Sequence, residues 1–165
     1  MSIKELSIDE KYKNLLDQSI LSDAINYAFH KELGVLDKYY DLYIAAQKRM
    51  LPSYMSAVFG FMKAITPGRT FKRVMNQVIE IMQMHHPLSQ LDINWISDRE
   101  VSIGVPNCEK LRKTGEFADK AGLDINPVAM CGFEARFFRD IFKEFDIEMK
   151  VTLKPGGCSS IATML

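Results

Sequence analysis

Two stretches in which apolar and polar residues alternate constrain this chain more than any other feature of its sequence. The first covers 91–105 and is interrupted by a turn at 97–98. The second covers 147–165 and is interrupted by Pro-Gly-Gly at 155–157. A period of two places successive side chains on opposite faces of a strand, so each stretch predicts a β-hairpin with one wet and one dry face.

The first half of the chain has the helical period instead. Helical patterns cover 23–33, 36–50 and 53–65, and Ser22 and Gly34 are placed to cap the first of them. The clearest stripe follows, with apolar residues at i, i+3, i+4, i+7, i+8 and i+11, namely Phe71, Val74, Met75, Val78, Ile79 and Met82.

A further helix is expected between the hairpins. Asn126 and Pro127 form a start signal, with asparagine as the cap and proline at the first helical position. The polar stretch 108–125 before it predicts a short helix and a loop. The expected fold is therefore α+β, with N-terminal amphipathic helices packed on a four-stranded antiparallel sheet of β-β-α-β-β order. A single domain is expected over 1–165, with a helical part at 1–87 and the β-β-α-β-β part at 88–165.

Charge and cysteine content limit the function classes. Lys and Arg number 21, as do Asp and Glu, so no long-range field favours nucleic acid, and no nucleic-acid partner is expected. No apolar run approaches the roughly 20 residues that span a bilayer, and the first residues lack a signal peptide's apolar stretch. Three cysteines, an odd number, argue against a secreted disulfide scaffold. A cytoplasmic protein without a membrane span is expected.

Three segments carry a resemblance to a known superfamily: 91–108, 126–133 and 149–158, each containing one cysteine. Together they resemble the small-molecule-binding domains named after bacteriochlorophyll 4-vinyl reductase, a superfamily that also holds core subunits of the TRAPP vesicle-tethering complex. The resemblance implies an apolar ligand held between helices and sheet, and helices that pair two subunits. A similar cysteine rhythm occurs in the 2-amino-thiazoline-4-carboxylate hydrolase family, which implies a hydrolase as the alternative.

The three cysteines are the first candidate site. In a β-β-α-β-β unit, Cys108, Cys131 and Cys158 would lie at element ends that converge at one edge of the sheet. Three thiolates with His85 or His86 as the fourth ligand would suit zinc or another thiolate-bound metal. The alternative is that the cysteines pack as small apolar residues and the histidines end a helix in solvent.

Cys131 also has a candidate catalytic role. It lies in the first turns after Asn126, where a helix dipole lowers the pKa of a thiol, and a nearby histidine would be the base. Against this, Cys131 shares the apolar face of its helix, where burial raises the pKa of a thiol instead.

The chain contains ten methionines and ten phenylalanines, more than one apolar stripe needs to cover a sheet. Such residues suit either a soft core or an apolar cleft. The leading hypothesis is therefore a domain that binds a small, largely apolar molecule and forms a homodimer; a protein-assembly module is the third alternative. The candidate ligand-binding residues are Phe59, Met62, Met75, Met82, Phe138 and, for a ligand carboxylate, Arg136.

Overall fold

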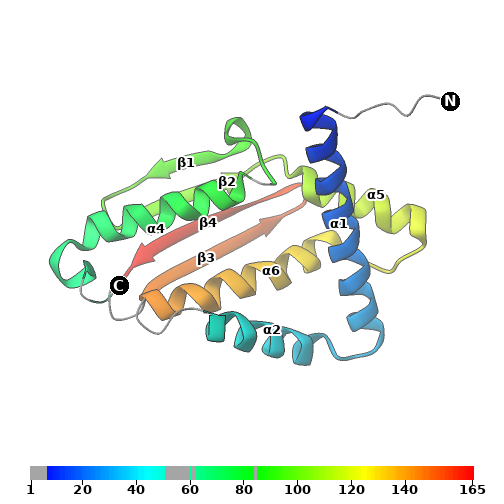
Figure 1. The fold of residues 1–165 in the computed structure, drawn as a ribbon, viewed down its shortest axis with the longest axis horizontal. Coiled ribbons are helices and arrows are strands. Elements are labelled where there is room, and N and C mark those ends of the chain that lie inside the picture. Colours follow the sequence, from blue (N-terminus) through cyan, green and yellow to red (C-terminus); the bar gives the residue numbers. More distant parts are fainter. Residues whose placement is uncertain (1–6, 51–59, 61, 84) are drawn as a thin grey trace.

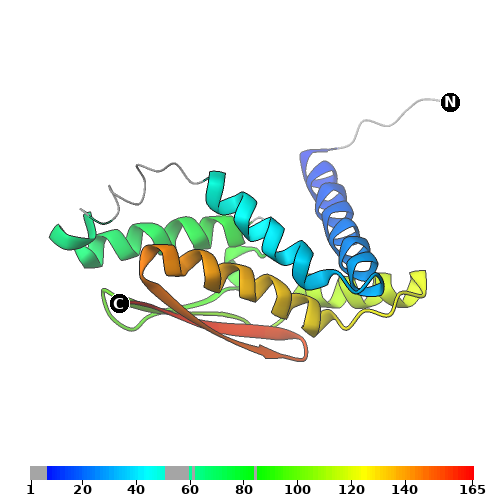
Figure 2. The same ribbon diagram turned by 90° about the horizontal axis from the view of Figure 1, so that it is seen from below.

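The computed structural model describes residues 7–50, 60, 62–83 and 85–165 of the chain. A four-stranded sheet carries helices on one side, as Figure 2 shows most clearly. Helices α4 (Pro67–Met82) and α6 (Pro127–Phe142) lie closest to the sheet, and α2 (Leu36–Met50) lies farther out beside α6 (Figures 1 and 2). Helix α1 (Ile8–Glu32) packs against α5 (Glu109–Ala121). The α+β class predicted from the sequence is confirmed.

The sheet is fully antiparallel, with strand order β1-β2-β4-β3. Its strands are β1 (Asp92–Trp95), β2 (Glu100–Val105), β3 (Ile147–Lys154) and β4 (Gly157–Met164). Both hairpins fall where the alternating pattern predicts them, and β4 returns into the middle of the sheet beside β2. The β1–β2 hairpin and the β3–β4 hairpin are thereby joined into one sheet.

The alternation separates a core face from an open face. Residues paired across the sheet on the core face include Val101 with Ala162 and Met149 with Ala162, and all three are buried. On the other face Ser102 lies opposite Ile161, whose side chain is exposed. The helices therefore cover only the apolar face of the sheet.

Helix α4 supplies the centre of the core. Phe71 and Met75 are fully buried against the sheet, and Ile79 is nearly so. The predicted stripe is confirmed, with Val74, Val78 and Met82 packed at its margins. The apolar helix predicted over 53–65 lies largely outside the described residues.

The predicted start of the first helix is wrong. Helix α1 begins after Ser7, whose hydroxyl accepts a hydrogen bond from the Glu10 N–H (3.2 Å) while the Glu10 carboxylate accepts one from the Ser7 N–H (2.8 Å). The helix therefore begins at this reciprocal capping box and not at Ser22, which lies inside the helix. The predicted stop is correct, because Gly34 follows the helix with φ of 67°, a conformation that favours glycine.

The start of α6 follows the predicted signal. The Asn126 side chain accepts hydrogen bonds from the N–H groups of Val128 and Ala129, and Pro127 is the first helical residue. The polar stretch before it forms α5, which ends at Gly122 in the left-handed conformation (φ 65°). Across the described part of the chain, no helix has the length and apolar character needed to cross a membrane.

Candidate functional site

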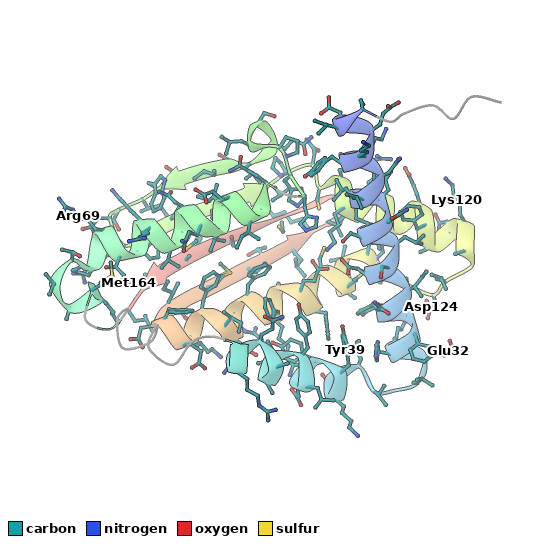
Figure 3. The ribbon with its side chains drawn as sticks, in the orientation of Figure 1. Glu32, Tyr39, Arg69, Lys120, Asp124 and Met164 are labelled. Atoms are coloured by element: carbon teal, nitrogen blue, oxygen red, sulfur yellow. The ribbon has the colours of Figure 1, made fainter. Side chains whose placement is uncertain are left out.

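Helices α1, α2 and α6 enclose a cleft of about 350 Å³. Its walls are mainly aromatic, and Figure 3 labels one of them, Tyr39, where α2 and α1 approach each other. The volume lies at the lower end of the range for small-molecule sites. The aromatic lining residues are Tyr27, Tyr39, Tyr43, Phe133, Phe137 and Phe138.

Phe133 of α6 organises the aromatic wall. Its ring is stacked on Tyr39 of α2, with centroids 6.1 Å apart and planes 11° from parallel. Tyr27 of α1 meets the same ring edge-on at 6.1 Å, and Tyr40 does so at 5.2 Å. Three helices thus contribute rings to one cluster, which fixes the cleft's shape by offset and edge-to-face contacts.

An ion-pair network around the buried Lys110 forms the polar side of the cleft. The Lys110 side chain of α5 is only 10% exposed, and its Nζ donates to Glu134 Oε1 (2.6 Å) and Asp23 Oδ2 (3.3 Å). Burial alone would lower the pKa of Lys110, but the Glu134 and Asp23 carboxylates outweigh it, so the pKa is raised. Lys110 is therefore a permanent cation that ties α1, α5 and α6 together.

His85 also lines the cleft, next to this network. Among the described residues, its buried Nδ1 atom has no hydrogen-bond partner, and the same holds for Nδ1 of His86. Burial and the Lys110 cation lower the pKa of His85, while burial and His85 lower that of His86. Both imidazoles are therefore neutral near pH 7, and an unpaired buried polar atom carries a free-energy cost.

The three cysteines gather near the place where the end of β2 pairs with the start of β4. Cys108 is buried beside Val105 and Leu111, and Cys131 and Cys158 pack against the same cluster. The Cys108 N–H donates to the Gly156 carbonyl (2.8 Å), and its Sγ accepts from the Leu111 N–H (3.4 Å). The convergence expected from the topology is therefore present.

Among the described residues, no group of three or more His, Cys, Asp and Glu side chains is placed to hold a metal ion. Burial in this apolar cluster raises the pKa of Cys108, Cys131 and Cys158, so the free thiols are neutral. Metal binding by Cys108, Cys131 and Cys158 with His85 or His86 therefore stays a prediction, and in the described residues the cysteines pack beside the apolar side chains of Val105 and Leu111.

The thiol of Cys131 is also poorly suited to nucleophilic attack. Burial, with the Glu134 carboxylate as the next cause, raises its pKa from 9.0 to about 12. Burial therefore outweighs the helix dipole that would favour the thiolate. The raised pKa argues against the catalytic role expected for Cys131, which stays a prediction.

The predicted ligand-binding residues divide among three places. Phe138 lines the cleft. Met75 is fully buried in the core, and Met82 packs between the core and the cysteine cluster, so these two side chains fill space in the protein itself. Met62 is partly buried just before α4, and Phe59 lies outside the described residues.

Arg136 is engaged by protein groups. Its guanidinium lies 3.8 Å from the centre of the Tyr40 ring and 2.8 Å from Asp37 Oδ1. The Tyr40 hydroxyl in turn donates to Asp140 Oδ2 (2.8 Å). Arg136 thus fastens α2 to α6 outside the cleft.

Most of the cleft was not predicted from the sequence. A usable signal was the i, i+4 spacing of aromatic residues, Tyr39 with Tyr43 on α2 and Phe133 with Phe137 on α6, which places each pair on one helical face. No local pattern marked Lys110 or Glu134.

Comparison with protein-family models, with curated proteins and with solved structures gives no match for this chain. Its function is therefore inferred from the geometry of the cleft and from the physical chemistry of the residues that line it.

Proposed function

We propose that the protein binds a small, largely apolar molecule, with one hydrogen-bonding group, in the cleft between α1, α2 and α6. The observation that carries this proposal is the combination of aromatic walls with the His85 imidazole and the Lys110–Glu134 ion pair on the polar side. Binding sites of this kind use apolar area for affinity and a few fixed polar groups for orientation.

The polar side defines what the ligand must offer. A neutral His85 imidazole has one donor and one acceptor nitrogen, and the tautomer decides which nitrogen is which. Glu134 and Asp23 are partly exposed, and both already accept from Lys110. A ligand group directed at His85 would therefore meet a site held in place by existing ion pairs, which lowers the ordering cost of binding.

The resemblance to the 4-vinyl reductase superfamily supports the same class of function, with a different location. In that superfamily the expected ligand space lies between helices and sheet. Here Phe71, Met75 and Ile79 occupy that layer, and the cleft lies one layer farther out, among the helices.

A blocking variant tests the proposal. Asn26 is an exposed residue of α1 that lines the cleft, whereas Asn14 is an exposed residue of the same helix away from the residues that line it. We expect Asn26→Trp to weaken binding of the apolar dye Nile red by at least about tenfold, because the indole occupies the ligand volume. Asn14→Trp is the matched control and should leave the affinity unchanged.

Native mass spectrometry of the purified protein complements the dye experiment. We expect a co-purified molecule of defined mass on the wild type and the Asn14→Trp variant, and its loss from Asn26→Trp. Absence of both a bound molecule and dye binding in the wild type would refute the proposal, as would equal dye binding by the two variants.

A further inference from the structure

Strand β3 forms one edge of the sheet and is as long as β4, its only neighbour in the strand order. Along this edge, β3 and α6 line a groove of about 740 Å³. Gly132, which has no side chain, and Ala135, with a single methyl group, line the α6 side of the groove. Among the described residues, no strand pairs with the outer edge of β3.

Two hydrogen bonds establish which backbone groups point outward. The Leu165 N–H donates to the Asp146 carbonyl (2.9 Å), whereas the Met164 N–H donates to Arg99 on the β2 side (2.9 Å). Backbone direction alternates along a strand, and the β3–β4 register is continuous with the pair Asp146 and Leu165. Met149, Val151 and Leu153 therefore direct their N–H and C=O groups toward the open edge.

We propose that β3 pairs with β3 of a second copy of this chain, antiparallel and with Val151 opposite Val151 on the two-fold axis, so that two sheets join into one. In an isologous pairing each residue meets its counterpart at an equal distance from the axis. Glu148 then lies opposite the partner's Lys154, and Lys150 opposite Thr152. Met149 lies opposite Leu153 on the apolar face.

The charges favour this register over its two neighbouring registers. A residue whose backbone groups point toward the open edge must pair with a residue of the same kind in the second copy. The two paired residue numbers therefore always have an even sum, and neighbouring permitted registers differ by two in that sum. One neighbouring register places Lys150 opposite Lys150, and the other places Lys150 opposite Lys154. The proposed register replaces that repulsion with two Glu148–Lys154 contacts and pairs the strands over nearly their full length.

The edge itself supports a second copy as the occupant. Charged residues on an edge strand commonly discourage pairing with another strand. Charges that serve only this purpose need not be arranged symmetrically about one residue of the strand. Here opposite charges stand at equal distances from Val151, which is the pattern of a self-complementary surface. The groove beside the edge leaves room for the second strand below α6.

The proposed interface differs from the helix-mediated pairing that the family resemblance implied. It is also independent of ligand binding, because the cleft and the β3 edge lie on different sides of α6 and share no lining residue.

Charge reversal tests the pairing by sedimentation equilibrium of the full chain at micromolar concentrations. We expect a dimer for the wild type. Glu148→Lys and Lys154→Glu, each alone, convert both cross-strand contacts into like-charge contacts and should each raise Kd at least about tenfold. Lys120→Glu, on exposed α5 surface away from the edge, is the matched control and should leave Kd unchanged.

An equimolar mixture of the two single variants provides the decisive result. In a mixed dimer, the Glu148→Lys chain would present two basic side chains to the two acidic side chains of the Lys154→Glu chain. The mixture should therefore associate although neither variant does alone. Circular dichroism of each variant establishes that it is folded. A monomeric wild type, single variants that dimerise as the wild type does, or a mixture that stays monomeric would each overturn the proposal.

Discussion

Replacing Gly157 by alanine should destabilise the protein through a backbone clash at the start of β4. A Cβ atom at this position would lie 2.2 Å from the Val105 carbonyl oxygen and 2.9 Å from that of Pro106. Because carbon–oxygen contacts are ordinarily about 3.3 Å or longer, the end of β2 would have to move by roughly 1 Å. Both obstructing atoms are backbone, so no side-chain rotation relieves the contact.

The expected cost follows from what that movement disrupts. Overpacking strain of this kind costs roughly 1–3 kcal/mol, and weakening one hydrogen bond at the end of the β2–β4 ladder adds about 1 kcal/mol. The free energy of unfolding should therefore fall by about 2–4 kcal/mol. For a chain of this size, that lowers Tm by roughly 5–15 °C.

Thermal and urea unfolding followed by circular dichroism measure this effect. Gly104→Ala is the matched control, since its new Cβ would meet the Asp92 Cβ at 3.4 Å, an ordinary contact within the same sheet. We expect that control to lie within about 1 kcal/mol of the wild type. Equal stability of Gly157→Ala and Gly104→Ala would refute the reasoning.

Two further predictions concern titratable groups. The pKa values of His85 and His86 in the folded protein lie below the ordinary 6.5. Below about pH 6.5 the unfolded chain therefore binds more protons than the folded protein. The free energy of unfolding should consequently fall as the pH falls. Tm measured between about pH 7 and pH 5 should decrease, and His85→Gln with His86→Gln should flatten the profile; a constant wild-type Tm would contradict this. Cys131, with its pKa raised to about 12, should react with iodoacetamide at pH 8 at least about a hundredfold more slowly in the folded protein than in urea. Peptide mass spectrometry measures the rates, and equal rates would disprove the shift.

The sheet could be predicted because its determinants are local. Alternation over 147–154 specifies a half-buried strand wherever the rest of the chain lies, and Asn126–Pro127 specifies a helix start from adjacent residues. The start of α1 could not be chosen on the same basis. Ser7 and Ser22 are both acceptable caps, and the choice depends on whether the residues between them find contacts, such as those of α1 with α5.

The cleft could not be predicted because its residues meet only through tertiary packing. Lys110 lies in a polar stretch that indicates a solvated helix. Its side chain is nevertheless buried, because Asp23 of α1 and Glu134 of α6 form ion pairs with its ammonium group. Met75 shows the converse. Its side chain suits a ligand cleft or a core equally, and only the packing of α4 against the sheet places it in the core.

The hairpin turn and the cleft are mechanically connected through α5. Gly156 accepts the Cys108 N–H, and Cys108 caps α5 by accepting from Leu111, so the β3–β4 turn determines where α5 begins. Lys110 lies in the first turn of that helix, and its position sets the polar side of the cleft beside Glu134. A shift of the β2 end by roughly 1 Å in Gly157→Ala would therefore displace Lys110 relative to Glu134. Since a buried ion pair depends on good geometry, this substitution far from the aromatic walls should weaken ligand binding as well as folding.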